Sequence, residues 1–246
     1  MFLTQAAMAV AALVVWRLAT PSLDGLSKPA RCLLLFVLLA MLFQRLIRHP
    51  LMDAVVTTAW SYSFLANLPA LVPFLVIACL VGWTTPRPLR PWQLIVSGLA
   101  IAVLAFPVGG MLAAWLSRPL LASAGDLAHA AVYTMPYGMH VLVPAYVTAL
   151  EPATATVALA GLVWDRLPGG TYARIAGFSV LVMVLDLHLL QPLVVLATEG
   201  PDRGSALVGI GQSWLATLVQ SMLGAATWAF SVAGSRPLHR PVRQSG

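Results

Sequence analysis

Long hydrophobic runs separated by short polar stretches dominate the chain. Each run has nearly the length of a transmembrane helix, because about 20 apolar residues are needed to cross a hydrocarbon core of about 30 Å. Prolines, glycines and arginines concentrate between the runs, where turns and lipid headgroups are expected. The runs that predict crossing helices cover residues 3–19, 30–47, 69–85, 92–116, 127–150, 172–197 and 206–233.

Two further apolar segments leave alternatives open. Residues 51–67 are rich in Thr, Ser, Trp and Tyr, and aromatic side chains of this kind favour the membrane–water interface. We expect a helix at the membrane surface there, with a full crossing as the alternative. Residues 153–164 would form a helix of only about 18 Å, too short to cross, so we expect a half-length helix. The alternative is that this segment fuses with a shifted preceding helix.

Composition indicates that lipid surrounds most side chains. Hydrophobic residues make up 60% of the 246 residues and charged residues only 9%, whereas a soluble domain carries about 25% charged residues. We expect an all-α polytopic membrane helix bundle of about seven transmembrane helices, plus one or two half-length or interfacial helices. Residues 1–234 would form this single domain, and residues 235–246 a basic, proline-rich cytoplasmic tail.

Lysine and arginine residues predict the orientation, because they are enriched in cytoplasmic loops. With seven crossings and the tail in the cytoplasm, most of the 14 Lys and Arg residues fall on the cytoplasmic side. We therefore expect a multi-pass protein of a bacterial-type inner membrane with its N-terminus outside. No basic stretch precedes the first run and no clean cleavage site follows it, so we expect this run to stay as a helix.

The stretch 126–151 contains the main candidate site. His129 and His140 are eleven residues apart, which places them on one face of a straight helix and about 16 Å from each other. Met139 adjoins His140, and imidazole and thioether ligands together suit copper or haem iron. Asp126 precedes His129 by three residues and is placed to orient its imidazole. Three alternatives stay open. The two histidines could be core side chains, Asp126 could be a carboxylate that the start of a helix favours, or the residues could form a proton relay.

Asp186 and His188 form a second candidate site within the run 172–197. Two residues apart, they do not face each other on a helix, so each needs a partner on another helix. An ionisable group at membrane depth must be paired, neutralised or exposed to a water-filled cavity, and such groups mark transport pathways. The functional alternative is a small transporter that uses both residues, and the structural alternative is an interhelical hydrogen bond.

Other polar residues favour structural roles. Gln212 and Gln220 share a helix face and predict interhelical hydrogen bonds, and Glu151 is expected at the membrane interface. Cys32 and Cys79 lie in apolar runs without metal-ligand spacing, so we expect them to be small core side chains. Metalloprotease, serine-hydrolase and nucleotide-binding motifs are missing from the sequence. The sequence therefore favours a protein without enzymatic activity.

Two stretches resemble the CtaG-type cytochrome c oxidase assembly factors, seven-span bacterial membrane proteins linked to copper delivery. Residues 140–152 are a histidine and an apolar run into proline, HVLVPAYVTALEP. Residues 200–214 are an acidic turn and a glycine-containing helix that reaches tryptophan, GPDRGSALVGIGQSW. The overall length and order of helices are also similar, whereas the closely spaced histidine pairs of that family are replaced by wider spacing. The resemblance implies that His140, and with it His129, contacts a metal.

The leading functional hypothesis is a membrane component that handles or assembles a copper or haem cofactor for a respiratory complex. It would use His129, His140, Met139 and Asp126. The alternatives are the transporter described above and an accessory subunit that packs against a larger membrane complex. The expected partners are membrane lipids and a larger membrane protein complex, and nucleic acid is not expected because the positive charge is dispersed over loop ends.

Overall fold

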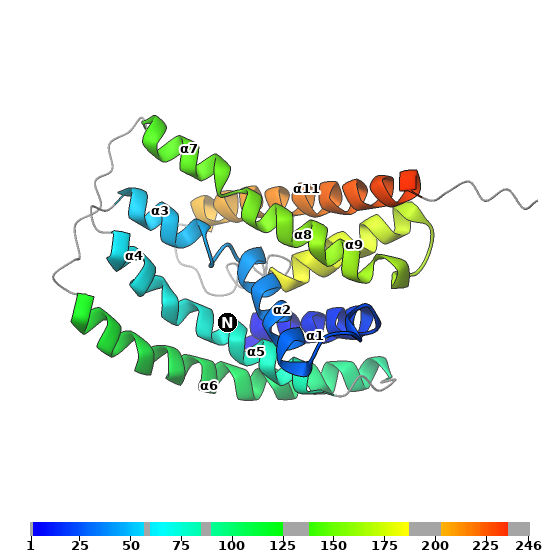
Figure 1. Cartoon of the computed structure of the whole chain (residues 1–246), viewed down its shortest axis with the longest axis horizontal. Helices are drawn as coiled ribbons and strands as arrows, with labels where there is room; N and C mark the ends of the chain where they lie inside the picture. Colours follow the sequence, from blue (N-terminus) through cyan, green and yellow to red (C-terminus); the bar gives the residue numbers. More distant parts are fainter. Residues whose placement is uncertain (1, 57–59, 85–89, 125–137, 187–202, 236–246) are drawn as a thin grey trace, which may run out of the picture.

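The chain folds into helices throughout the part that the structure describes. This computed structural model describes residues 2–56, 60–84, 90–124, 138–186 and 203–235, and no strand occurs in these ranges. The first helices are α1 (Phe2–Ala19), η1 (Thr20–Leu23), α2 (Lys28–Leu42), α3 (Arg48–Val56), α4 (Trp60–Asn67), η2 (Leu68–Leu71), α5 (Val72–Trp83) and α6 (Pro91–Ala124). The others are α7 (Met139–Val147), α8 (Leu150–Val163), η4 (Trp164–Arg166), α9 (Thr171–Leu185) and α11 (Arg203–Ser235) (Figure 1).

Several helical segments have the length and apolar character of membrane crossings. Four of them are long enough to span a bilayer, namely Gln5–Leu23, Trp60–Trp83, Pro91–Ala122 and Met139–Arg166. A fifth apolar helix, Thr171–Leu185, is shorter. The expected all-α architecture is confirmed for the described residues, and their helices are compatible with a membrane protein. The number of seven crossings stays a prediction.

The segment 51–67 does not form the single interfacial helix that its composition predicts. Its first residues complete α3, and its last residues form α4. α4 leads through η2 into α5, so that the apolar segment Trp60–Trp83 passes through Pro69. Pro69 lies in the first turn of a 3-10 helix, where its missing N–H costs no hydrogen bond. The helix expected at 69–85 therefore begins earlier than predicted.

The half-length helix expected at 153–164 is part of a longer helical segment. α7 and α8 are separated only by a turn at Thr148 and Ala149. Together with η4 they form the membrane-length segment Met139–Arg166. The structure thus favours the alternative in which this segment fuses with a shifted preceding helix.

Two other helices end before their apolar runs end. α2 ends at Leu42, although the run predicts a helix to residue 47. α9 ends at Leu185, although the run predicts a helix to residue 197. Hydropathy alone does not reveal these ends, because the residues that follow are also largely apolar. Both ends contribute to the candidate functional site described below.

α6 continues through Pro107 and is 34 residues long. A neighbouring helix approaches α6 closely next to Pro107. A Cβ on Gly109 would lie 3.2 Å from the Cα of Pro73 at the start of α5. The glycine therefore allows the backbones of α5 and α6 to come close together.

α1 lies inside the bundle, and α6 lies at its edge (Figure 1). α1 packs against α5, α6, α8 and α9. About 61% of its apolar segment is buried, compared with 28% for α6. Ala9 and Ala12 of α1 are completely buried, and such small side chains let neighbouring helices approach closely. α1 is therefore a central element of the bundle, against which α5, α6, α8 and α9 pack.

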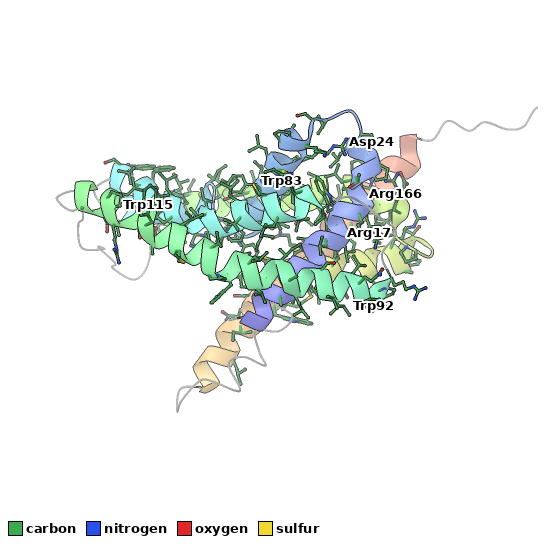
Figure 2. All side chains as sticks on the ribbon, turned by 90° about the horizontal axis from the view of Figure 1, so that it is seen from below. Arg17, Asp24, Trp83, Trp92, Trp115 and Arg166 are labelled. Carbon is green, nitrogen blue, oxygen red and sulfur yellow. The ribbon has the colours of Figure 1, made fainter. Side chains whose placement is uncertain are left out.

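The outer face of α6 has the character of a lipid-facing surface. Val103, Phe106 and Met111 on this face are 56%, 48% and 72% exposed. Trp92 and Trp115 bound the face and are separated by about 35 Å along the helix, close to the thickness of a bilayer core. Figure 2 shows these two tryptophans toward opposite ends of the bundle. Exposed tryptophans at this separation are typical of the two membrane–water interfaces.

One end of the bundle gathers positive charge, and we call it the basic end. Its described Lys and Arg residues are Arg17, Lys28, Arg31, Arg90, Arg166 and Arg174. Figure 2 shows Arg17 and Arg166 on the same side of the molecule as Trp92. The Arg166 guanidinium donates a hydrogen bond of 2.9 Å to the Leu18 carbonyl, which ties η4 to the end of α1. The basic end thus lies at the Trp92 end of the lipid-facing surface of α6 (Figure 2).

Candidate functional site

The residues of the predicted metal site do not converge in the part of the chain that the structure describes. Asp126 and His129 lie outside the described residues. Met139 and His140 begin α7, and both side chains are exposed. The preceding Gly138 has an extended backbone (φ −69°, ψ 164°), so one uninterrupted helix carrying His129 and His140 on one face is wrong. Within the described ranges, no three His, Cys, Asp or Glu residues are grouped to hold a metal ion.

Asp186 has a buried hydrogen-bond partner on another helix. It caps the C-terminus of α9 instead of lying within a helix, and only 8% of the residue is exposed. The Oγ1 hydroxyl of Thr217 on α11 donates a hydrogen bond of 3.0 Å to its carboxylate. The structural alternative for Asp186, an interhelical hydrogen bond, is therefore present in the structure. His188 lies outside the described residues, so its role stays a prediction.

A second polar contact joins α11 to α8. The side-chain amide of Gln220 donates a hydrogen bond of 3.1 Å to the hydroxyl of Thr156, which is completely buried. A Cβ on the nearby Gly224 would lie 2.7 Å from the methyl group of Thr156. Because position 224 has no side chain, α8 and α11 approach closely enough for the hydrogen bond between Gln220 and Thr156. The interhelical bond predicted for Gln220 is confirmed, whereas Gln212 is exposed.

Glu151 is a functional candidate, and its predicted place at the membrane interface stays a prediction. It lies in the first turn of α8, near the middle of the apolar segment Met139–Arg166, and is only 5% exposed. Its carboxylate accepts hydrogen bonds from the backbone N–H groups of Leu46 (3.0 Å), Ile47 (3.2 Å to each oxygen) and Arg48 (2.6 Å). These groups lie at the N-terminus of α3, where N–H groups have no partner within the helix and the helix dipole favours negative charge.

A tight turn between α2 and α3 presents these N–H groups to Glu151. The Arg45 N–H donates to the Ala40 carbonyl and the Gln44 N–H to the Met41 carbonyl, which is the hydrogen-bond pattern of a Schellman motif. Gln44 has the left-handed φ of 58° that this motif requires and that glycine adopts without strain. The chain therefore changes direction at Gln44 and begins α3 directly against Glu151.

The Gln44 turn leads to a prediction about stability. Replacing Gln44 with glycine should raise the free energy of unfolding by about 1 kcal/mol, because a left-handed residue with a side chain costs about 1–2 kcal/mol. The measurement is the thermal midpoint in detergent by size-exclusion chromatography. Replacing Gln212 with glycine is the control, since glycine at this exposed position within α11 should lower stability by about 1 kcal/mol. A Gln44 variant that is destabilised as much as the Gln212 variant would contradict the strain assigned to this turn.

The two helix breaks lie side by side and bind each other. α2 packs against α8, and α3 packs against α7, so the broken segments run antiparallel with their breaks at one level. The Arg48 guanidinium donates a hydrogen bond of 2.9 Å to the Ala145 carbonyl near the C-terminus of α7. The helix dipole favours a cation at the C-terminus of α7, just as it favours a carboxylate at the N-terminus of α3. Arg48 and Glu151 thus each complement the opposite break.

Five polar side chains of α8, α9 and α11, four of them buried and Gln220 half-buried, form what we call the polar layer. Its members are Glu151, Thr156, Asp186, Thr217 and Gln220. Glu151 and Asp186 each lie fifteen residues, or about 22 Å, from the helix ends next to the basic end, at Arg166 and Thr171. Both carboxylates therefore lie at a similar depth, between the levels of Trp92 and Trp115.

An open cavity of about 380 Å³ lies between α8 and α11 at the polar layer. Ala149, in the turn before α8, and Ala153 of α8 line it on either side of Glu151 in sequence, and Gln220 and Gly224 line it from α11. Its walls are mainly apolar, with the amide of Gln220 among the polar groups that reach it. The cavity gives a small polar solute or water a place next to the Gln220–Thr156 bond.

A signal for Glu151 was present in the sequence. When residues 139–166 are taken as one apolar segment, Glu151 is an acidic residue near its centre, with Pro144 and Pro152 on either side. The sequence instead predicted separate helices at 127–150 and 153–164. Glu151 then fell between the two helices and was expected at the membrane interface. No family model, curated protein or solved structure matches the chain, and its resemblance to the CtaG-type assembly factors stays a prediction.

Proposed function

We propose that this chain is a small multi-pass membrane transporter that moves protons through the polar layer. The observation that carries the proposal is the pair of buried carboxylates, Glu151 and Asp186, at a common depth in an apolar bundle. Carboxylates at such depth are costly and in membrane proteins serve as proton relays or ion sites. Thr217 of α11 donates a hydrogen bond to Asp186, and Gln220 of α11 donates one to Thr156 on the helix that carries Glu151.

The paired helix breaks support a transporter over an inert packing subunit. Discontinuous helices near the bilayer midplane form the ion and substrate sites of many transporters, because their free backbone ends bind charge. In this chain the break between α2 and α3 offers N–H groups, and that between α7 and α8 offers carbonyl groups. Irregular backbone is tolerated at such depth when protein or a water-filled cavity surrounds it.

The proposal includes a placement in the membrane. The basic end faces the cytoplasm of a bacterial-type inner membrane, because Lys and Arg residues favour that side. Seven crossings then result when α2 with α3, α4 with α5, and α7 with α8 each cross once, and α1, α6, α9 and α11 cross singly. The N-terminus lies outside in this arrangement, and the face of α6 between Trp92 and Trp115 contacts lipid.

The copper or haem hypothesis has less support from the described residues. Met139 is 70% exposed and His140 is exposed beside it, so the two side chains lie at the surface of α7. A metal site there requires Asp126 and His129, which lie outside the described residues. The transporter is preferred because Glu151 and Asp186 are both buried carboxylates in an apolar bundle.

The test is a proton flux measurement on reconstituted protein. Liposomes of phosphatidylethanolamine and phosphatidylglycerol enclose the pH dye pyranine, and a potassium gradient with valinomycin imposes a membrane potential. We expect the wild-type protein to acidify the lumen faster than protein-free liposomes do. Replacing Asp186 with asparagine should reduce this flux at least tenfold, because the amide cannot bind and release a proton.

Two further variants make the measurement specific. Replacing Thr217 with valine removes the hydroxyl that bonds Asp186 but keeps the carboxylate, so the flux should fall to an intermediate value. Replacing Asp165 with asparagine is the control, since this carboxylate is exposed at the basic end and its loss should leave the flux unchanged. A wild-type flux equal to that of protein-free liposomes, or an unaffected Asp186 variant, would contradict the proposed function.

A further inference from the structure

A groove between α2 and α5 brings the two cysteines of the chain to one surface. Cys32 on α2 and Cys79 on α5 both line this open cavity of about 500 Å³. Both are free thiols. Their apolar surroundings predicted that they lie in the buried core, whereas both are partly exposed. Lys28 and Trp83 line the same groove at the basic end. The groove is formed by other helices than the polar layer.

The packing of Gly82 shows how closely the thiols approach. A Cβ on Gly82 would collide with the Sγ of Cys32 and lie 3.4 Å from its Cβ. Cys79 precedes Gly82 by three residues and so lies next to it on the same face of α5, with about 5–6 Å between such positions. The Cys32 thiol therefore occupies the space above Gly82, beside Cys79.

We propose that Cys32 and Cys79 form a binding site for a single soft monovalent cation, Cu(I), at the basic end of the bundle. Thiolates select soft ions such as Cu(I), which two sulfur ligands can hold in linear coordination. Zn²⁺ would need four ligands, and no third His, Cys, Asp or Glu residue joins the pair among the described residues. The site is separate from the predicted ligands His140 and Met139 on α7.

The binding step balances in charge and protons. Two thiols and one Cu(I) ion give a bis-thiolate complex of net charge −1 and release two protons, without oxidation or reduction. The ammonium group of Lys28, on the same groove, provides a positive charge for this complex. Gly82 is required as well, because a side chain there would displace the Cys32 sulfur.

The test is a competition for Cu(I) between the full-length protein in detergent and the coloured chelator bicinchoninate, under anaerobic conditions. We expect the wild-type protein to remove one Cu(I) per chain from the chelator. The Cys32→Ser and Cys79→Ser variants should each bind at least tenfold more weakly. Gly82→Ala should also weaken binding, although it keeps both thiols. X-ray absorption of the loaded protein should show two sulfur neighbours.

Control variants distinguish the thiol site from Cu(I) binding elsewhere on the chain. His140→Ala and Met139→Ala should bind Cu(I) as the wild type does, and Gly110→Ala serves as the control for Gly82→Ala because a Cβ at position 110 meets open space. Size-exclusion profiles identify any variant that fails to fold. Wild-type affinity in the Cys32→Ser/Cys79→Ser double variant, or failure of the wild type to compete with the chelator, would overturn the proposal.

Discussion

Replacing Glu151 with alanine is expected to destabilise the protein more than the loss of any other side chain of the polar layer. The substitution leaves the partly buried N–H groups of Leu46, Ile47 and Arg48 without their acceptor. Each buried donor without a partner costs about 1–3 kcal/mol, so the total loss should be about 3 kcal/mol or more. The thermal midpoint of the detergent-purified protein should fall steeply, with little monodisperse protein recovered.

Two comparisons sharpen this prediction. Glu151→Gln keeps one side-chain oxygen as an acceptor, so its thermal midpoint should lie between those of the wild type and Glu151→Ala. Asp165→Ala is the matched control, because this acidic residue is exposed in η4. An unchanged midpoint for Glu151→Ala would mean that the contact between the two helix breaks does not stabilise the fold.

Replacing Gly98 with alanine is expected to separate α1 from α6. A Cβ at this position would collide with the side chain of Val10 and lie 2.9 Å from its Cα. Because the obstacle includes backbone, rotation of one side chain cannot relieve it, and overpacking of this kind costs about 1–3 kcal/mol. The thermal midpoint should fall by about 2–4 °C for each kcal/mol lost.

Gly110→Ala provides the matched control within the same helix. Position 110 is exposed, and an added Cβ there meets no atom within 4 Å. Alanine favours helix over glycine by about 1 kcal/mol, so this variant should be as stable as the wild type or more stable. Equal thermal midpoints for the Gly98 and Gly110 variants would show that α1 and α6 do not pack as described.

Hydrophobic periodicity and length predicted most helices but misplaced several of their ends. The apolar run 92–116 predicted α6, because an exposed apolar helix can be recognised from the composition of its own residues. The end of α2 at Leu42 was missed, because a glutamine instead of a glycine adopts the left-handed conformation that closes the helix. Only the partner 104 residues away, Glu151 against Ile47, explains why the chain turns there.

The candidate site was predicted in part for the same reason. Asp186 was identified from its charge within an apolar run, and its partner Thr217 was not, because contacts between helices distant in sequence leave no local pattern. The thiol pair was missed because Cys32 and Cys79 are 47 residues apart and meet only when α2 packs against α5. Sequence position therefore indicated single polar residues, and tertiary packing determined which of them act together.

Hydrogen exchange tests the central structural claim most directly, namely that Glu151 joins two helix breaks at membrane depth. In nanodiscs, the backbone amides of Leu46, Ile47 and Arg48 should exchange slowly, although amides at a helix start have no partner within the helix. The same amides should exchange faster in Glu151→Gln, while amides within α8 stay protected. Rapid exchange of the three amides in the wild-type protein would contradict the claim.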